Sequence, residues 1–354
     1  MPGAGPENGP EGLTHAPADV VRYEALHADA APGGCAVSGV LRPGDAPYAA
    51  AVPTTAPVVP PADHTESVLI VLDAPTVEQP PSSPGYHRQD PRQPQLRVDD
   101  LGATRGDGVF ETVGVFDGRP VQLEPHLDRL QHSGQLLDFP QIRTEVWHEA
   151  ILAAIDAADG TELSVKAVLT RGVEGTGTAT GWVLAFPAPE SERARREGLD
   201  VVTISRGYSS DIAQTSPWLL QGAKTTSYAV HMAALREARR RGAEDVIFTS
   251  TDSYVLEGPT STVVLRAGEE LLTPATDQGI LAGTTQDLLF RFAADHGIRA
   301  VARPVLKAEL RTAEHVWLCS SVRLCAPVRA IDGRSLPIDT DLAEQFLGYA
   351  RREG

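Results

Sequence analysis

The chain has 354 residues, a net charge of −16 and 42% hydrophobic residues, which suits one or two globular domains. No apolar stretch approaches the roughly 20 residues that a membrane-spanning helix needs, so no membrane association is expected. The acidic total argues against nucleic-acid binding, which relies on basic surfaces that neutralise phosphates. Residues 1–12 contain neither a basic start nor an apolar run, so we expect no secretory signal and a cytoplasmic location.

Cysteine and lysine are both scarce in the sequence. The cysteines lack the spacing of a metal site, which predicts reduced thiols and no bound metal: Cys35, Cys319 and Cys325. Lysine occurs at three positions: Lys166, Lys224 and Lys307. Any chemistry that needs a lysine amine must therefore use one of these three.

The first half of the chain predicts a tail followed by a smaller domain. Residues 1–65 are rich in Pro, Gly and Ala and lack apolar periodicity, which indicates a disordered tail. Residues 66–186 are expected to form an N-terminal α/β domain, with a linker at 187–189. Its predicted elements are a strand at 67–72, a surface loop at 79–95, a strand at 108–116, a turn at 117–118, a helix at 125–137 and strands at 163–170 and 182–186.

Strands and helices alternate more clearly in the second half, and residues 190–354 are expected to form a larger domain. Its predicted elements are a strand at 201–206, a helix at 229–241 closed by Gly242, a hairpin of 245–249 and 254–256, a strand at 262–265, a helix at 284–296 ended by Gly297, a strand at 315–320 and a helix at 341–352. Because strict βαβ alternation is missing, the predicted fold class is α+β rather than a doubly wound sheet.

Lys224 and Glu257 lie in settings that suit chemistry. Lys224 is surrounded by small residues, between a predicted strand and the helix that begins near residue 229. A desolvated lysine can lose its proton and attack a carbonyl, whereas the alternative is an ordinary exposed lysine. Glu257 follows an apolar strand and precedes Gly-Pro. It either caps the turn or pairs with a protonated heterocycle.

A candidate anion site begins at Gly279 and leads into the helix that starts near Thr284. Free backbone N–H groups and the hydroxyls of Thr284 and Thr285 suit an anion, although Thr284 is also an ordinary N-cap residue. Ser320 and Ser321, at the end of an apolar strand, offer further hydroxyls.

Arg129 and several histidines are open to a structural interpretation. Arg129 lies beside the apolar stripe of the helix 125–137; it either reaches inward to a phosphate or extends outward, and the pattern alone favours the outward orientation. The following histidines lack ligand-like spacing and are interpreted as structural or surface residues: His126, His132, His231 and His315. The sequence contains no G-x-S-x-G elbow, H-E-x-x-H motif or Walker loop.

Seven segments, taken in order, resemble the class-IV (fold-type IV) pyridoxal-phosphate family. The resemblance runs from about residue 98 to residue 335. The segments are 105–112 (Arg-Gly-Asp-Gly-Val-Phe-Glu-Thr), 126–130 (His-Leu-Asp-Arg-Leu), 169–172 (Leu-Thr-Arg-Gly), 222–228 (Gly-Ala-Lys-Thr-Thr-Ser-Tyr), 256–258 (Leu-Glu-Gly), 279–285 and 320–328. It implies two α/β domains with pyridoxal 5'-phosphate between them, and a homodimer in which the partner chain helps to build each site.

The resemblance also implies a role for individual residues. Lys224 would hold the cofactor and later move protons. Glu257 would pair with the pyridine nitrogen, and Tyr228 would lie near the phenolic oxygen. The residues implied for the phosphate are Arg129, Thr284, Thr285 and Ser321, and those implied for a small amino substrate are Arg171, which would lie near its carboxylate, Phe110 and Thr112.

Within the family, the segments 105–112 and 222–228 look most like those of 4-amino-4-deoxychorismate lyases, which release 4-aminobenzoate and pyruvate for folate synthesis. One departure is that residues 173–177 lack the second arginine that some lyases carry. The alternative function is an aminotransferase acting on D-amino acids or branched-chain amino acids. A further alternative is a non-catalytic homologue that still binds the cofactor.

Overall fold

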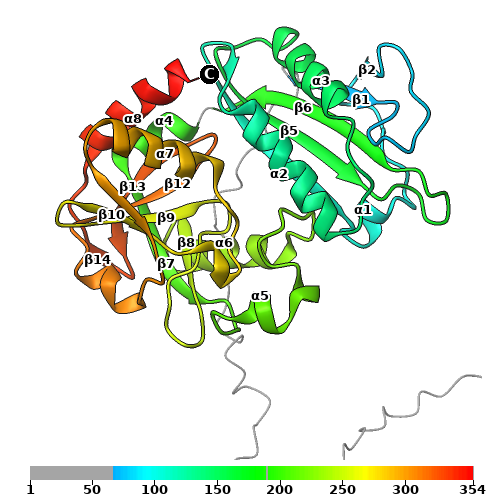
Figure 1. Cartoon of the computed structure of the whole chain (residues 1–354). Coiled ribbons are helices and arrows are strands. Elements are labelled where there is room, and N and C mark those ends of the chain that lie inside the picture. Colours follow the sequence, from blue (N-terminus) through cyan, green and yellow to red (C-terminus); the bar gives the residue numbers. More distant parts are fainter. Residues whose placement is uncertain (1–66, 189, 354) are drawn as a thin grey trace, which may run out of the picture. The chain divides into compact units, whose positions relative to one another are not determined.

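A computed structural model describes residues 67–188 and 190–353 (Figure 1). The expected disordered tail at 1–65 lies outside the described residues. The described residues all belong to one compact unit. Two sheets and their covering helices make up this unit, which confirms the predicted α+β class.

Within residues 67–188, six strands form an antiparallel sheet in the order β2-β1-β6-β5-β3-β4. The strands are β1 (Val68–Leu72), β2 (Tyr86–Gln89), β3 (Gly108–Phe116), β4 (Arg119–Pro120), β5 (Glu162–Thr170) and β6 (Thr180–Pro187). The helices are α1 (Leu101–Thr104), α2 (Leu123–Leu136) and α3 (Thr144–Asp156). Figure 1 shows α2 and α3 running along this sheet, where they bury a core that includes Val109, Val113 and the fully buried Trp147.

In the described residues from 190 onward, a second sheet has the order β11-β10-β9-β12-β13-β7-β8, and β14 pairs with β13. Its strands are β7 (Leu199–Ser205), β8 (Asp245–Thr249), β9 (Thr262–Ala267), β10 (Glu270–Thr273), β11 (Arg299–Ala302), β12 (His315–Ser320), β13 (Leu324–Ile331) and β14 (Arg334–Ser335). The α-helices are α4 (Glu190–Glu197), α5 (Ile212–Thr215), α6 (Ala229–Arg240), α7 (Thr284–Asp295) and α8 (Thr340–Arg352), and the 3-10 helices are η2 (Pro217–Leu219), η3 (Thr276–Gln278) and η4 (Lys307–Arg311).

Most predicted elements are present, and their bounds differ by a few residues. The prediction of an unbroken surface loop at 79–95 is wrong, because Tyr86–Gln89 pairs with β1 as the short strand β2. The predicted hairpin of 245–249 and 254–256 is present: an isolated bridge joins Thr249 and Val255, and backbone hydrogen bonds join Phe248 to Leu256 and Glu257. On its other side, β8 pairs with β7 in parallel, and the connection between them contains α5, η2 and α6. The predicted domain boundary at 187–189 stays a prediction, and residue 189 is not described.

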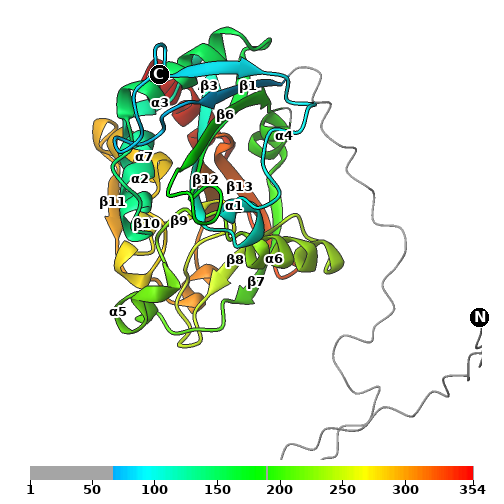
Figure 2. The same cartoon turned by 90° about the vertical axis from the view of Figure 1, so that its right-hand side faces the viewer.

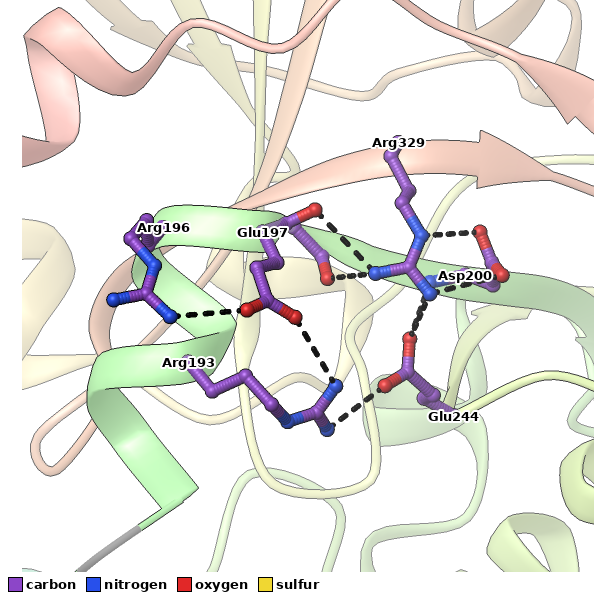
Figure 3. A network of polar contacts seen from close by, with 7 residues as sticks. Arg193, Arg196, Glu197, Asp200, Glu244 and Arg329 are labelled. Carbon is purple, nitrogen blue, oxygen red and sulfur yellow. Dashed lines mark hydrogen bonds and ion pairs between the residues drawn. The ribbon is translucent and has the colours of Figure 1, made fainter.

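An ion-pair network on the second sheet joins α4 to β7 and β13 (Figure 3). Arg329 contacts Asp200 at 3.0 Å and Glu244 at 2.8 Å, and Glu244 also accepts from Arg193 at 3.0 Å. Glu197 extends the network along α4. These side chains are partly exposed, so the network joins elements at the surface rather than lining a site.

Candidate active site

Lys224 lies in the loop between η2 and α6, and its backbone is held from two sides. Its carbonyl accepts from the N–H of Phe110 at 2.9 Å, while its own N–H donates to the Ser133 hydroxyl at 3.1 Å. A bridge between Val109 and Thr225 continues this pairing along β3. This loop from the second half of the chain is therefore attached to β3 of the first sheet and to α2, which covers that sheet.

The amine of Lys224 is buried and lies 4.6 Å from the centre of the Phe110 ring. Burial lowers the pKa of Lys224 to about 8, and the nearby charges of Glu111 and Glu257 oppose this only in part. An amine with this pKa has a sizeable uncharged fraction near neutral pH. It can therefore act as a nucleophile and can accept or return a proton.

Tyr228 and His231 stand beside the lysine. The Tyr228 hydroxyl donates to the Pro259 carbonyl at 2.5 Å, and its ring stacks on His231 with centroids 4.4 Å apart. Burial raises the pKa of Tyr228, which keeps the phenol protonated. Burial and the neighbouring Arg206 lower the pKa of His231 to about 4, so this imidazole is neutral.

The Glu257 carboxylate follows the segment that pairs with β8, and its two oxygens have different partners. One accepts from the Arg206 guanidinium at 3.2 Å, and the other accepts from the backbone N–H of Leu281 at 3.1 Å. Arg206 also stacks over Phe248, with 4.7 Å between its guanidinium carbon and the ring centre. Glu257 is thus a fixed carboxylate, not a free turn cap.

The N-terminus of α7 is open toward the cavity. Its N-cap residue, Gly283, supplies no side-chain cap, so the N–H groups of the first turn are available to an anion. Thr284 and Thr285 begin the helix, and the Thr285 hydroxyl lies 3.5 Å from that of Ser321. Three hydroxyls and a helix N-terminus converge here, which is a suitable arrangement for a phosphate.

Behind these hydroxyls lies a buried group formed by Arg129, Glu111 and His126. Arg129 donates to both Glu111 oxygens at 2.7 and 2.8 Å and to the Ala282 carbonyl at 2.6 Å. Its side chain is 10% exposed, so the outward orientation that the pattern favoured is wrong. Burial alone would raise the pKa of Glu111, but Arg129 and then His126 hold it well below its usual range.

Arg171, at the end of β5, is already engaged. It donates to both carboxylate oxygens of Asp107 at 2.7 and 3.1 Å and to the Leu137 carbonyl at 2.5 Å. Its guanidinium also stacks over Phe139 at 4.3 Å. Any carboxylate that approaches Arg171 must therefore share it with Asp107.

One cavity of about 2040 Å³ brings all ten predicted residues together. Its wall includes Phe110, Thr112, Arg129, Arg171, Lys224, Tyr228, Glu257, Thr284, Thr285 and Ser321. The volume exceeds the roughly 300–1,000 Å³ of a typical ligand pocket, so there is room for a cofactor together with a substrate. Figure 2 shows α2 and α7 from a second side, and a contact of 3.3 Å between His126 and Thr284 joins the two helices.

Sequence reasoning missed four residues at this site: Glu111, His126, Arg206 and His231. For Glu111 a signal was available, because it alternates with Val109 and Val113 and so lies on the core face of β3. His126 is three residues before Arg129 and therefore shares its helix face. For Arg206 and His231, whose partners are distant in the chain, no comparable local signal exists.

Comparisons with known proteins agree with this geometry. A model of the family described as amino-transferase class IV matches residues 108–331. A bifunctional aminodeoxychorismate lyase / D-amino acid transaminase from Mycobacterium tuberculosis is 44% identical, over 72% of this chain and 92% of that protein. An aminodeoxychorismate lyase from Bacillus subtilis is 30% identical, over 66% of this chain and 80% of that protein.

Solved structures give the same result. A fold IV transaminase from Curtobacterium pusillum is 49% identical with a TM-score of 0.78, and the match covers 81% of this chain and 98% of that one. A hypothetical aminotransferase from Mycobacterium tuberculosis in its PLP-bound form is 40% identical with a TM-score of 0.75, covering 81% and 100%. This chain belongs to the class IV aminotransferase family, whose members are pyridoxal-phosphate-dependent enzymes of fold type IV acting on small amino substrates. The family and the fold predicted from sequence are confirmed.

Proposed function

We propose that this chain is a pyridoxal 5'-phosphate-dependent 4-amino-4-deoxychorismate lyase in which Lys224 holds the cofactor. The observation that carries the proposal is a buried amine of lowered pKa, in the same cavity as a fixed carboxylate and an open helix N-terminus. These features supply the attachment point, the partner for a ring nitrogen and the anion site that this cofactor requires. A relative that is named both as lyase and as D-amino acid transaminase supports the choice of reaction.

The anion end of the cavity fits a phosphate ester. The hydroxyls of Thr284, Thr285 and Ser321 would surround it, together with the first-turn N–H groups of α7. Gly283 allows a close approach of backbone here, since a Cβ at this position would lie 2.5 Å from the Thr262 hydroxyl. Arg129 would supply positive charge from behind, although its N–H groups already bind Glu111 and Ala282.

At the other end, the Glu257 carboxylate would accept a hydrogen bond from the protonated pyridine nitrogen. Arg206 and Leu281 hold this carboxylate in position. Bound pyridoxal phosphate supplies an electron sink for the pair left behind when a substrate carbon loses its proton. Lys224 would take that proton, because its lowered pKa leaves part of the amine uncharged. Tyr228 would stand near the phenolic oxygen as a neutral phenol.

The substrate would lie against the exposed face of β3, where Phe110 and Thr112 line the cavity. Arg171 would contact its carboxylate in competition with Asp107. In the lyase, proton loss is followed by elimination of pyruvate as the ring becomes aromatic. In a transaminase, the proton returns to a different carbon instead, so the same residues serve both outcomes.

The D-amino acid transaminase is the second candidate, favoured by the double name of the Mycobacterium tuberculosis relative.

We also propose that the protein is a homodimer. Large apolar side chains are exposed at the cavity wall, including Trp218 at 73% and Val230 at 62%. Exposed apolar clusters of this kind commonly mark protein interfaces. Light scattering that gives the mass of a monomer would contradict the dimer.

Among the described residues, no helix is long and apolar enough to cross a bilayer. The cytoplasmic location stays a prediction.

The deciding experiment is a coupled assay in which chorismate, glutamine and an aminating synthase feed the cofactor-loaded protein. We expect 4-aminobenzoate and pyruvate in equal amounts, lost in Lys224→Ala and retained in Lys307→Ala, an exposed lysine on η4. Loss of activity in both variants would point to a folding defect rather than to a role for Lys224. No product from a loaded wild type that converts D-alanine to pyruvate would replace the lyase with the transaminase.

A further inference from the structure

His126 lies between the buried Glu111 and the hydroxyls at the anion site. Its Nδ1 is 2.7 Å from a Glu111 oxygen, and its Nε2 is 3.1 Å from the Ser321 hydroxyl and 3.3 Å from that of Thr284. The imidazole and the carboxylate are each 1% exposed. His126 therefore connects the Arg129–Glu111 pair to two of the groups proposed to hold phosphate.

The partner on each side determines where the ring carries its proton. Glu111 is ionised and accepts, so Nδ1 carries the proton that lies between them. Burial lowers the pKa of His126, which leaves Nε2 without a proton in the ligand-free protein. Nε2 is then an acceptor, and a hydroxyl that donates to it cannot donate to an anion in the cavity.

The charges around His126 leave this end of the site close to neutral. Arg129 from α2 and Glu111 from β3 form a buried pair that cancels, and Lys224 faces the ring from the η2–α6 loop. Asp287 on α7 faces Arg129, and burial raises the pKa of this carboxyl. A phosphate dianion at the start of α7 would thus meet the free N–H groups of the first turn but little net positive charge.

We propose that His126 takes up a proton from solvent when a phosphate dianion binds at the N-terminus of α7. The inference rests on the proposed function of the site. With protons on both nitrogens, His126 donates to Ser321 or Thr284 instead of accepting, which frees both hydroxyls to donate to the phosphate. Glu111 stabilises the imidazolium from the other side, as a nearby anion does for any buried cation. His126 is accordingly a positioning residue that acts through the hydroxyls.

The test compares pyridoxamine 5'-phosphate with pyridoxamine, which differ only in the phosphate and do not attach covalently to lysine. Calorimetric titrations at pH 7.5, in buffers of different ionisation enthalpy, give the protons taken up with each ligand. A free phosphate ester is mostly a dianion at this pH, since its second pKa is about 6. We expect the phosphorylated ligand to take up about one proton more, and its affinity advantage to fall by up to about tenfold per pH unit above neutrality.

The variant that separates His126 from Lys224 is His126→Asn, whose amide can still donate to Glu111 but cannot reach the hydroxyls as Nε2 does. We expect it to bind the phosphorylated ligand more weakly and without the extra proton. The matched control is His132→Asn, an exposed histidine on the same helix, which should behave as the wild type. An extra proton that persists in His126→Asn would belong to another group and would overturn the inference.

A second measurement needs no variant, because it uses the wild-type protein alone. In wild-type protein with ¹⁵N-labelled histidine, one buried ring should gain its second proton with pyridoxamine 5'-phosphate and not with pyridoxamine. Equal proton uptake for both ligands, or no histidine that changes, would overturn the inference while leaving a cofactor site in place. Failure of both ligands to bind would remove the proposed function as well.

Discussion

Two of the guanidinium–carboxylate networks among the described residues differ mainly in burial. The network around Arg329 is at the surface, where its arginines, Asp200 and the glutamates are between 28% and 68% exposed (Figure 3). The network of Arg129, Glu111 and His126 is between 1% and 10% exposed. Water screens the charges of the first network, whereas the side chains of the second are almost fully buried. Removing one partner of an ion pair should therefore cost more stability in the second network.

The buried network should be the more costly of the two to break. Glu111→Gln would leave Arg129 charged, buried and without its carboxylate, which typically lowers the free energy of unfolding by about 3–5 kcal/mol. Urea denaturation would measure this as a lower midpoint with an unchanged slope. The double variant Glu111→Gln with Arg129→Met should recover part of the loss, because the unpaired charge is then gone. A single-variant loss below about 1 kcal/mol would mean that water reaches Arg129.

The next largest effect concerns how closely β3 approaches the anion site. A Cβ added at Gly114 would lie 2.0 Å from the carbonyl oxygen of Ser321, so Gly114→Ala must move one of the two backbones. We expect a loss of about 1–3 kcal/mol in the free energy of unfolding and weaker binding of pyridoxamine 5'-phosphate. The control is Gly134→Ala in α2, where a Cβ would meet Phe139 at an ordinary 3.5 Å. That variant should be neutral or stabilising, since alanine is the better helix former.

Low pH should remove the stability that the ionised Glu111 contributes to the buried network. Its folded-state pKa is depressed, so its contribution to stability is present above the unfolded value of about 4.3 and is lost as pH falls through the folded value. Wild type should therefore exceed Glu111→Gln by the full difference near pH 6 and by progressively less from about pH 4 downward. Thermal unfolding of both proteins across this range gives the comparison. A difference that does not change with pH would show that the glutamine costs stability through packing, not charge.

The sequence was most informative where chemistry depends on neighbouring residues in the chain. The Lys224 loop, the Glu257 turn and the segment that opens α7 could be recognised as short motifs, and the structure brings them into one cavity. The contact of His126 with Ser321 spans 195 residues, and Arg206 reaches Glu257 across 51. No local pattern encodes such pairs. The strand Tyr86–Gln89 was missed for a related reason, because a short polar edge strand is defined by its partner β1 rather than by its own residues.

The smallest effect is expected at the surface network, where Glu244→Gln removes the carboxylate shared by Arg193 and Arg329. Arg329 keeps Asp200 at 3.0 Å and also donates to the Gly198 carbonyl at 2.5 Å, so no charge is left isolated. We expect the free energy of unfolding to fall by about 0–1 kcal/mol. This difference should shrink as salt rises toward 1 M, where the Debye length is about 3 Å. Glu111→Gln should keep most of its effect at the same salt concentration, because the Glu111 and Arg129 side chains are only 1% and 10% exposed and salt screens buried charges much less. If both variants lost their effect equally in salt, burial would not be what separates the two networks.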